Sequence, residues 1–215
     1  MEIKKLIVGQ LQTNCYIVSE KGSSETMLID PGAEGNRIAD ACLQLEINPV
    51  LVVNTHAHYD HIGANAALKR RFPALRFAAG ELDADAVTDP VMNLSAGFGV
   101  SETMPSPDIR LKDGDRTGLP ECEFRVHHTP GHTRGGISLV STDASPPVVF
   151  CGDLIFAEGV GRTDLPGGSA AKLRESIHNL LLACPDCSVL YPGHGPATTV
   201  GEQKQLYLAK PEQFI

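Results

Sequence analysis

The chain has 215 residues, and its 18 lysines and arginines stand against 26 aspartates and glutamates, which gives a formal net charge of −8 at pH 7. With 42% hydrophobic and 20% charged residues, the composition is that of a folded globular protein and excludes a disordered or fibrous one. The acidic balance argues against a nucleic-acid partner, because affinity for a phosphate backbone rests on clustered lysine and arginine.

The first half of the chain reads as strands and helices in alternation. Short β-rich runs, most of them bounded by glycine, serine or asparagine, predict strands over residues 3–8, 14–19, 26–29, 50–53 and 76–79. Apolar residues at helical spacing predict helices over 33–45 and 62–72, each of which ends before a proline. The continuous apolar run at 50–53 is typical of a strand that is buried on both faces.

The second half begins with residues 88–115, which are rich in proline, glycine and serine and are predicted to form a long surface excursion. Further strands are predicted over residues 123–128, 137–141, 148–151 and 188–191. Ser169 is expected to cap a helix that runs to residue 183, and a short helix is predicted from residue 201. Strands and helices mixed in both halves predict a layered α/β (α+β) sandwich, with one domain over residues 1–215.

The amino terminus and the cysteines indicate the compartment. The opening residues, MEIKKLIVGQ, hold too short an apolar run for a secretion signal, and no stretch of the sequence is long and apolar enough for a membrane span. We therefore expect a cytoplasmic protein without a membrane partner, with its 6 cysteines as reduced thiols. The one Cys-x-x-Cys pair, Cys184 and Cys187, precedes a predicted strand and is interpreted as an incidental loop pair rather than a redox or zinc site.

Histidines and aspartates follow four of the predicted strands, each within a few residues of the strand's carboxyl end. Open α/β sheets build their sites at that edge, so we expect these side chains to converge. The set consists of His56, His58, Asp60 and His61 after the strand at 50–53, His132 after 123–128, Asp153 after 148–151, and His194 after 188–191. Imidazole and carboxylate donors without thiolate suit zinc, manganese or iron.

The density of these ligands predicts two metal ions. Four side chains from one six-residue turn cannot all reach a single tetrahedral ion and leave room for three more ligands, whereas two ions roughly 3.5–4 Å apart can share them. We expect His56 and His58 on one ion and Asp60 and His61 on the other. Asp153 is the expected bridging ligand, because its carboxylate has two oxygens. The predicted cofactor is a pair of divalent ions, zinc in the first place, with iron or manganese as alternatives.

One aspartate and three histidines outside these motifs are also considered. Asp30 is either a turn residue before Pro31 or a hydrogen-bond partner of a ligand histidine. His127 and His128 lie on the strand before His132, where one of them is expected to face inward. His178 lies on the predicted late helix and is expected at the surface.

The four motifs together resemble the metallo-β-lactamase superfamily. They are Thr55-His56-Ala57-His58-Tyr59-Asp60-His61, Thr129-Pro130-Gly131-His132-Thr133, Gly152-Asp153 and Pro192-Gly193-His194-Gly195. The resemblance implies an αββα sandwich with the metals at one edge. It further implies a first metal on His56, His58 and His132, a second on Asp60, His61 and His194, and Asp153 between them.

Within that superfamily, the stretch Gly161-Arg162-Thr163-Asp164-Leu165-Pro166-Gly167-Gly168 resembles the type II glyoxalase and persulfide dioxygenase branch, above all compact bacterial glyoxalase II-like proteins. This implies a cytoplasmic thioesterase that converts S-lactoylglutathione to glutathione and D-lactate. Asp60 would orient the attacking hydroxide, and Arg162 matches the position that contacts the glycine carboxylate of glutathione. The sequence after His194 is shorter than the helical glutathione-binding domain of full-length glyoxalase II.

Two other functions are compatible with these motifs. The first is a mononuclear iron persulfide dioxygenase acting on glutathione persulfide, whose ligands would match His56, His132 and Asp153. The second is a metal-binding regulatory or interaction domain without catalytic activity. The sequence has neither a Gly-x-Ser-x-Gly motif nor a Gly-Lys-Ser/Thr phosphate loop, which excludes the usual serine hydrolases and nucleoside triphosphatases.

Overall fold

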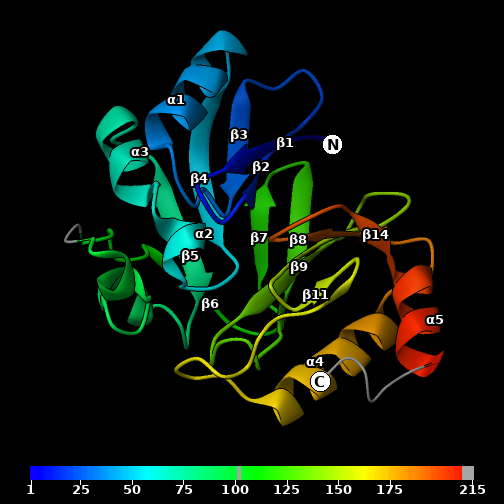
Figure 1. The fold of residues 1–215 in the computed structure, drawn as a ribbon. Helices are drawn as coiled ribbons and strands as arrows, with labels where there is room; N and C mark the ends of the chain where they lie inside the picture. Colours follow the sequence, from blue (N-terminus) through cyan, green and yellow to red (C-terminus); the bar gives the residue numbers. More distant parts are fainter. Residues whose placement is uncertain (101–102, 210–215) are drawn as a thin grey trace.

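Two six-stranded sheets lie face to face between two layers of helices in the computed structural model, which describes residues 1–100 and 103–209 (Figure 1). The first sheet has the order β1 (Glu2–Val8), β2 (Thr13–Ser19), β3 (Glu25–Ile29), β4 (Asn48–Asn54), β5 (Arg76–Gly80) and β6 (Ile109–Leu111). The second has the order β14 (Thr198–Thr199), β13 (Val189–Pro192), β10 (Val148–Gly152), β9 (Ile137–Ser141), β8 (Cys122–His128) and β7 (Arg116–Leu119). A small hairpin joins β11 (Ile155–Phe156) to β12 (Gly159–Val160).

The helices cover the outer faces of the sheets. The first sheet is covered by α1 (Gly35–Gln44) and α3 (Asn65–Arg71), and the second by α4 (Ala170–Ala183) and α5 (Val200–Ala209) (Figure 1). A four-residue helix, α2 (Tyr59–Ile62), and two 3₁₀ turns, η1 (Ala86–Thr88) and η2 (Ser95–Phe98), lie in the connections. Of the described helices, none is long and apolar enough to cross a lipid bilayer.

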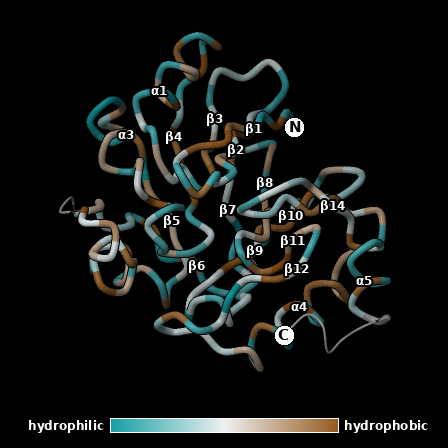
Figure 2. Tube along the Cα trace, in the orientation of Figure 1, coloured by the Kyte–Doolittle hydropathy of each residue, from teal (hydrophilic) through white to brown (hydrophobic). Residues whose placement is uncertain are grey.

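Three apolar cores separate these four layers, and Figure 2 shows hydrophobic stretches along the strands in the interior. The central core joins side chains of both sheets, among them Met27, Val53, Phe124 and Phe150. A second core packs β1 to β5 against α1 and α3, and a third packs β10 and β13 against α4 and α5. Because each sheet is buried on both faces, the αββα sandwich predicted from the sequence is confirmed.

The strand directions bring the predicted ligands to one edge. β3, β4, β5 and β6 run parallel to one another, and β10 runs parallel to β13. The carboxyl ends of β4, β10 and β13, together with that of β8, therefore open toward the same region between the sheets. The Ser169 cap is also present, since its hydroxyl accepts a hydrogen bond from the Lys172 amide at the start of α4.

Two predicted elements differ from the structure. The helix expected over 62–72 is shorter, since α3 begins at Asn65 and Ile62 instead ends α2, and the Ala64 amide between them donates to the Pro31 carbonyl. The excursion over 88–115 contains η2 and β6, which pairs in parallel with β5. Asp108 fixes that pairing, because its amide donates to the Phe77 carbonyl and its carboxylate accepts from the Phe77 amide. Three residues are too few for a periodic pattern to reveal such a strand.

Candidate metal centre

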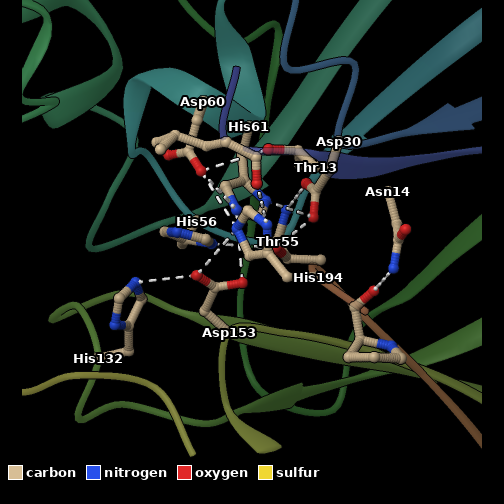
Figure 3. A network of polar contacts seen from close by, with 12 residues as sticks. Thr13, Asn14, Asp30, Thr55, His56, Asp60, His61, His132, Asp153 and His194 are labelled. Atoms are coloured by element: carbon tan, nitrogen blue, oxygen red, sulfur yellow. Dashed lines mark hydrogen bonds and ion pairs between the residues drawn. The ribbon is translucent and has the colours of Figure 1, made fainter. Parts of the chain in front are cut away.

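All seven predicted ligand residues meet at the edge between the two sheets, and Figure 3 labels all of them except His58. His56 and His58 lie in the turn after β4, and Asp60 and His61 lie on α2, which begins at the end of that turn. The other three come from the second sheet, with His132 after β8, Asp153 after β10 and His194 after β13. The centre is therefore built from both sheets.

Glycines allow the loops of the centre to approach one another. A Cβ on Gly32 would lie 1.5 Å from the Asp60 carbonyl oxygen, so only glycine lets the loop after β3 pass beside α2. A Cβ on Gly193 would lie 2.2 Å from Asp153 Oδ1 and 2.5 Å from His61 Cε1. The Pro-Gly-His turn thus needs its glycine because it packs directly against two predicted ligands.

The ligand atoms form three overlapping groups, and within each group they lie within 4.8 Å of one another. The groups are His56, His58 and His132; His56, His61 and Asp153; and Asp60, His61 and His194. Asp153 faces the others with both oxygens, since Oδ1 lies 3.4 Å from His61 Nε2 and Oδ2 lies 3.6 Å from His132 Nε2 and 3.5 Å from His194 Nε2. Asp60 Oδ2 lies 3.2 Å from His194 Nε2. The Asp153 carboxylate therefore lies between the histidines of both expected metal sets, where a bridging ligand would lie.

Four buried ring nitrogens and one carboxylate oxygen at the centre have no hydrogen-bond partner, as is expected of atoms that bind metal ions. The Nε2 atoms of His56, His58, His61 and His132, and Oδ1 of Asp153, are buried without a hydrogen-bond partner. An unsatisfied buried polar atom is destabilising by about 1–3 kcal/mol, so five of them in one place need a common explanation. Divalent cations accept lone pairs from all five atoms, and the imidazole and carboxylate donors fit zinc, iron or manganese.

The opposite ring nitrogens are held by fixed acceptors. His132 Nδ1 donates to the Arg162 carbonyl at 2.8 Å, and His194 Nδ1 donates to the Leu11 carbonyl at 3.0 Å. His61 Nδ1 lies 3.0 Å from Asp30 Oδ2. Because a carbonyl oxygen can only accept, Nδ1 of His132 and of His194 carries a proton, and Nε2 of each ring faces the centre.

Asp30 proves to be the hydrogen-bond partner of a predicted ligand, the second of its two interpretations. Its Oδ1 accepts from the Thr55 amide at 2.7 Å, and its Oδ2 accepts from the Thr55 hydroxyl at 2.6 Å and contacts His61. Asp30 is buried and has a φ of 51°, in the left-handed region. It therefore joins the ends of β3 and β4 and orients a histidine of α2.

The electrostatics divide the histidines into two kinds. Burial lowers the pKa of His56 well below its usual value and that of His58 to about 3, so both rings are neutral lone-pair donors. Burial also acts to lower the pKa of His61, but the Asp153 and Asp60 carboxylates outweigh it and hold that pKa well above its usual value. The imidazoles likewise hold the pKa of Asp60 low despite its burial. Both carboxylates of the centre are thus ionised.

Asp83 is a structural support of the centre that the sequence did not reveal. Its buried carboxylate accepts hydrogen bonds from the Ala57 amide at 3.2 Å, the Thr133 hydroxyl at 2.7 Å and the Gly135 amide at 2.6 Å. Burial raises its pKa, which these bonds partly offset. Asp83 therefore ties the turn that carries His56 and His58 to the loop that carries His132.

The remaining histidines and cysteines of interest lie outside the three ligand groups. His128 Nε2 pairs with the Arg134 carbonyl, His127 faces a cavity beside α4, and the His178 ring lies 6.5 Å from that of Tyr207. Cys184 is buried and Cys187 exposed, and both are free thiols.

A cleft of about 600 Å³ lies in front of the centre and includes His58, Asp60, Asp153 and His194 in its lining. Arg162 also lines it, but its guanidinium is paired with Asp164 through two hydrogen bonds of 2.7 Å each. The contact of this residue with the centre is its backbone carbonyl on His132. A side-chain motif cannot reveal that role, because every residue type has the same carbonyl.

Comparison with known proteins supports the family resemblance seen in the sequence. A family model described as the metallo-beta-lactamase superfamily matches residues 8–194. Hydroxyacylglutathione hydrolase GloC of Haemophilus influenzae is 32% identical over 213 residues, which cover 95% of this chain and 96% of that protein. The crystal structure of BLEG-1 B3 metallo-beta-lactamase superposes with a TM-score of 0.88 at 32% identity, covering 95% of this chain and 97% of the other. TTHA1623 in a di-iron-bound form gives a TM-score of 0.81 at 32% identity, with 94% and 97% covered.

Proposed function

The chain belongs to the metallo-β-lactamase superfamily as a metal-dependent hydrolase with a histidine-rich metal site, and we propose that it hydrolyses thioesters as a type II glyoxalase does, with S-lactoylglutathione as the reference substrate. The similarity to GloC, which is named a hydroxyacylglutathione hydrolase, supports this substrate class. The observation that carries the proposal is the pair of aspartates set among histidines at the base of an open cleft.

The donor set supports two ions. His56, His58 and His132 would hold one, and Asp60, His61 and His194 the other, with the Asp153 carboxylate between them. Two divalent ions supply a water whose pKa is lowered toward about 7 and positive charge for the oxyanion of a thioester. Zinc is the first candidate, and the di-iron form of TTHA1623 supports iron as the alternative.

The residues of the chain would position that chemistry. Asp60 Oδ2 accepts from the Thr13 hydroxyl at 3.3 Å, and Asp60 lines the cleft, where its other oxygen would orient the attacking water. The leaving group is a thiolate, and with a thiol pKa of about 8.5 it needs no strong general acid. In agreement, the described residues that line the cleft include no carboxylic acid besides Asp60 and Asp153.

The test is a metal count joined to an assay of S-lactoylglutathione hydrolysis by the metal-loaded protein. We expect two metal ions per chain and release of glutathione. Asp153→Ala should abolish hydrolysis and lower the occupancy of both ions, whereas Asp143→Ala, an exposed aspartate in the turn between β9 and β10, should change neither.

Three results would contradict the proposal. Intact hydrolysis in Asp153→Ala would exclude the bridging role. One iron per chain with oxygen uptake on glutathione persulfide would favour the persulfide dioxygenase. A fully loaded protein that is inert toward thioesters, lactones and persulfides would favour a non-catalytic metal-binding domain.

A further inference from the structure

A second cavity of about 280 Å³ opens beside the metal centre, between the β1–β2 turn, the start of α2 and η2. We call it the side pocket, and its apolar wall consists of Val8, Leu11, Ala33, Tyr59, Phe98 and Val100. Leu11, Asp60 and Phe98 line both this pocket and the main cleft. The two cavities therefore adjoin along these three residues.

The mouth of the side pocket exposes large apolar side chains. Leu11 is 49% exposed and Phe98 is 53% exposed, and both stand within reach of the predicted ligands. Scattered apolar side chains on a surface need no explanation, but a cluster at the border of a concave site marks a surface that binds an apolar group.

The charges around both cavities give the same indication. Among the described residues that line the side pocket there is no lysine, arginine or histidine, and its only charged group is Asp60. In the main cleft the one lysine or arginine among the described lining residues is Arg162, and Asp164 already neutralises it. A glutathione moiety carries two carboxylates and one ammonium group. The lining thus offers no unpaired arginine or lysine to bind it.

We propose that the side pocket binds the apolar acyl chain of the substrate, so that the protein prefers thioesters of aliphatic acids to the lactoyl thioester. This inference rests on the thioester hydrolase function proposed above. Arg162 lies on the His132 side of the centre and the side pocket on the Asp60 side. A thioester carbonyl at the centre would then direct its acyl chain into the pocket and its thiol toward Arg162.

The volume sets the length of that chain. A water-sized group occupies about 30 Å³, so the pocket has room for roughly nine such groups. A methylene group is of similar size, and an acyl chain of about six to eight carbons fills the space from the carbonyl at Asp60 inward.

The first experiment measures kcat/KM of the metal-loaded protein for acetyl, butanoyl, hexanoyl and octanoyl thioesters of one uncharged thiol, N-acetylcysteamine, beside S-lactoylglutathione. Each buried methylene should raise kcat/KM about two- to fourfold, since its burial stabilises by up to about 0.8 kcal/mol. The rise should end at about six to eight carbons, where the pocket is full.

Variants locate the effect. Phe98→Ala and Leu11→Ala should lower the ratio of kcat/KM for the hexanoyl thioester to that for the acetyl thioester, by about fivefold or more. Leu182→Ala is the matched control, because Leu182 is an apolar side chain on α4 that is 68% exposed and lies outside both cavities. It should leave the ratio unchanged.

A binding measurement separates this inference from the proposed function. Calorimetry of the metal-loaded protein with acetate, butanoate, hexanoate and octanoate should show tighter binding of the longer chains, and Phe98→Ala should remove that trend. Hydrolysis that is fastest for S-lactoylglutathione and indifferent to acyl length would overturn the side-pocket assignment and leave the thioester hydrolase intact. Failure to hydrolyse any thioester would overturn the hydrolase. Alkanoate binding that does not depend on chain length or on Phe98 would overturn the side pocket by itself.

Discussion

Replacement of Asp30 by asparagine tests whether a buried carboxylate fixes the ring orientation of His61. The carboxylate accepts three hydrogen bonds, two from Thr55 and one from His61 Nδ1. Asparagine has the same shape and readily adopts positive φ, so the backbone conformation at φ 51° is retained. The substitution therefore isolates the loss of one acceptor oxygen and its charge.

The expected magnitude follows from these three contacts. If the amide oxygen of the asparagine accepts from the Thr55 amide, its NH₂ group faces the Thr55 hydroxyl and His61 Nδ1. The hydroxyl can turn and accept, but the ring must move its proton from Nδ1 to Nε2, the atom that faces the metal centre. A charge-assisted hydrogen bond contributes about 1.5–3 kcal/mol, which corresponds to a loss of about 10- to 100-fold in affinity for the ion at His61.

The assay is competition for metal between a chromogenic chelator and the protein, with elemental analysis of the dialysed samples. Asp30→Asn should weaken the affinity of the protein for one of its two ions about 10- to 100-fold. Asp108→Asn is the matched control. Asp108 also accepts a backbone hydrogen bond, from the Phe77 amide, at a distance from the centre. Metal affinity in Asp30→Asn equal to that of the unmodified protein would refute the role of Asp30 in orienting His61.

Three further substitutions or treatments have defined outcomes. Gly193→Ala should lower occupancy of both ions in elemental analysis, because its Cβ would lie 2.2 Å from Asp153 Oδ1, and full occupancy would contradict the packing. An ion present at 100 times its Kd stabilises the folded protein by about 2.7 kcal/mol, so removal of each such ion with a chelator should lower Tm by about 5–10 °C. An unchanged Tm in a thermal scan would show that metal binding is not linked to folding. Asp83→Asn should reduce the free energy of unfolding in urea by about 1–3 kcal/mol because one buried donor loses its acceptor, whereas Asp85→Asn, an exposed neighbour, should not.

The positions of the predicted ligands could be read from the sequence because they depend on strand ends. A short apolar run such as residues 50–53 marks a strand, and the side chains after it must emerge at the edge of the sheet. The same argument places Asp153 and His194 beside one another, since β10 and β13 are parallel neighbours. The residue types and the ends of the apolar runs carry this information, and both are local to the motifs. The pairing of β10 with β13 itself comes from the structure.

The contacts that support the ligands could not be predicted, because two of them are made to backbone carbonyls, which every residue type has. His194 Nδ1 donates to the backbone carbonyl of Leu11, and His132 Nδ1 to that of Arg162. Any residue offers such a carbonyl, so only the tertiary structure selects these two. Asp83 does have a distinctive side chain, but its donors lie 26 to 52 residues away, and no spacing rule connects them.

The same long-range contacts tie metal binding to the junction of the two sheets. β2 holds the turn that carries His194, because the Asn14 amide donates to the Gly193 carbonyl at 2.7 Å and the Tyr16 hydroxyl to the Pro192 carbonyl at 2.6 Å. The Asn14 side chain donates to the Pro192 carbonyl at 2.9 Å, and Figure 3 shows Asn14 apart from the ligand side chains. The Asp60–His194 contact therefore joins α2 to a turn of the second sheet that β2 of the first sheet already holds. A bound ion would add a further link between α2 and the turn that carries His194. Loss of metal should therefore loosen the edge between the sheets, while the apolar core around Phe124 and Phe150 stays packed.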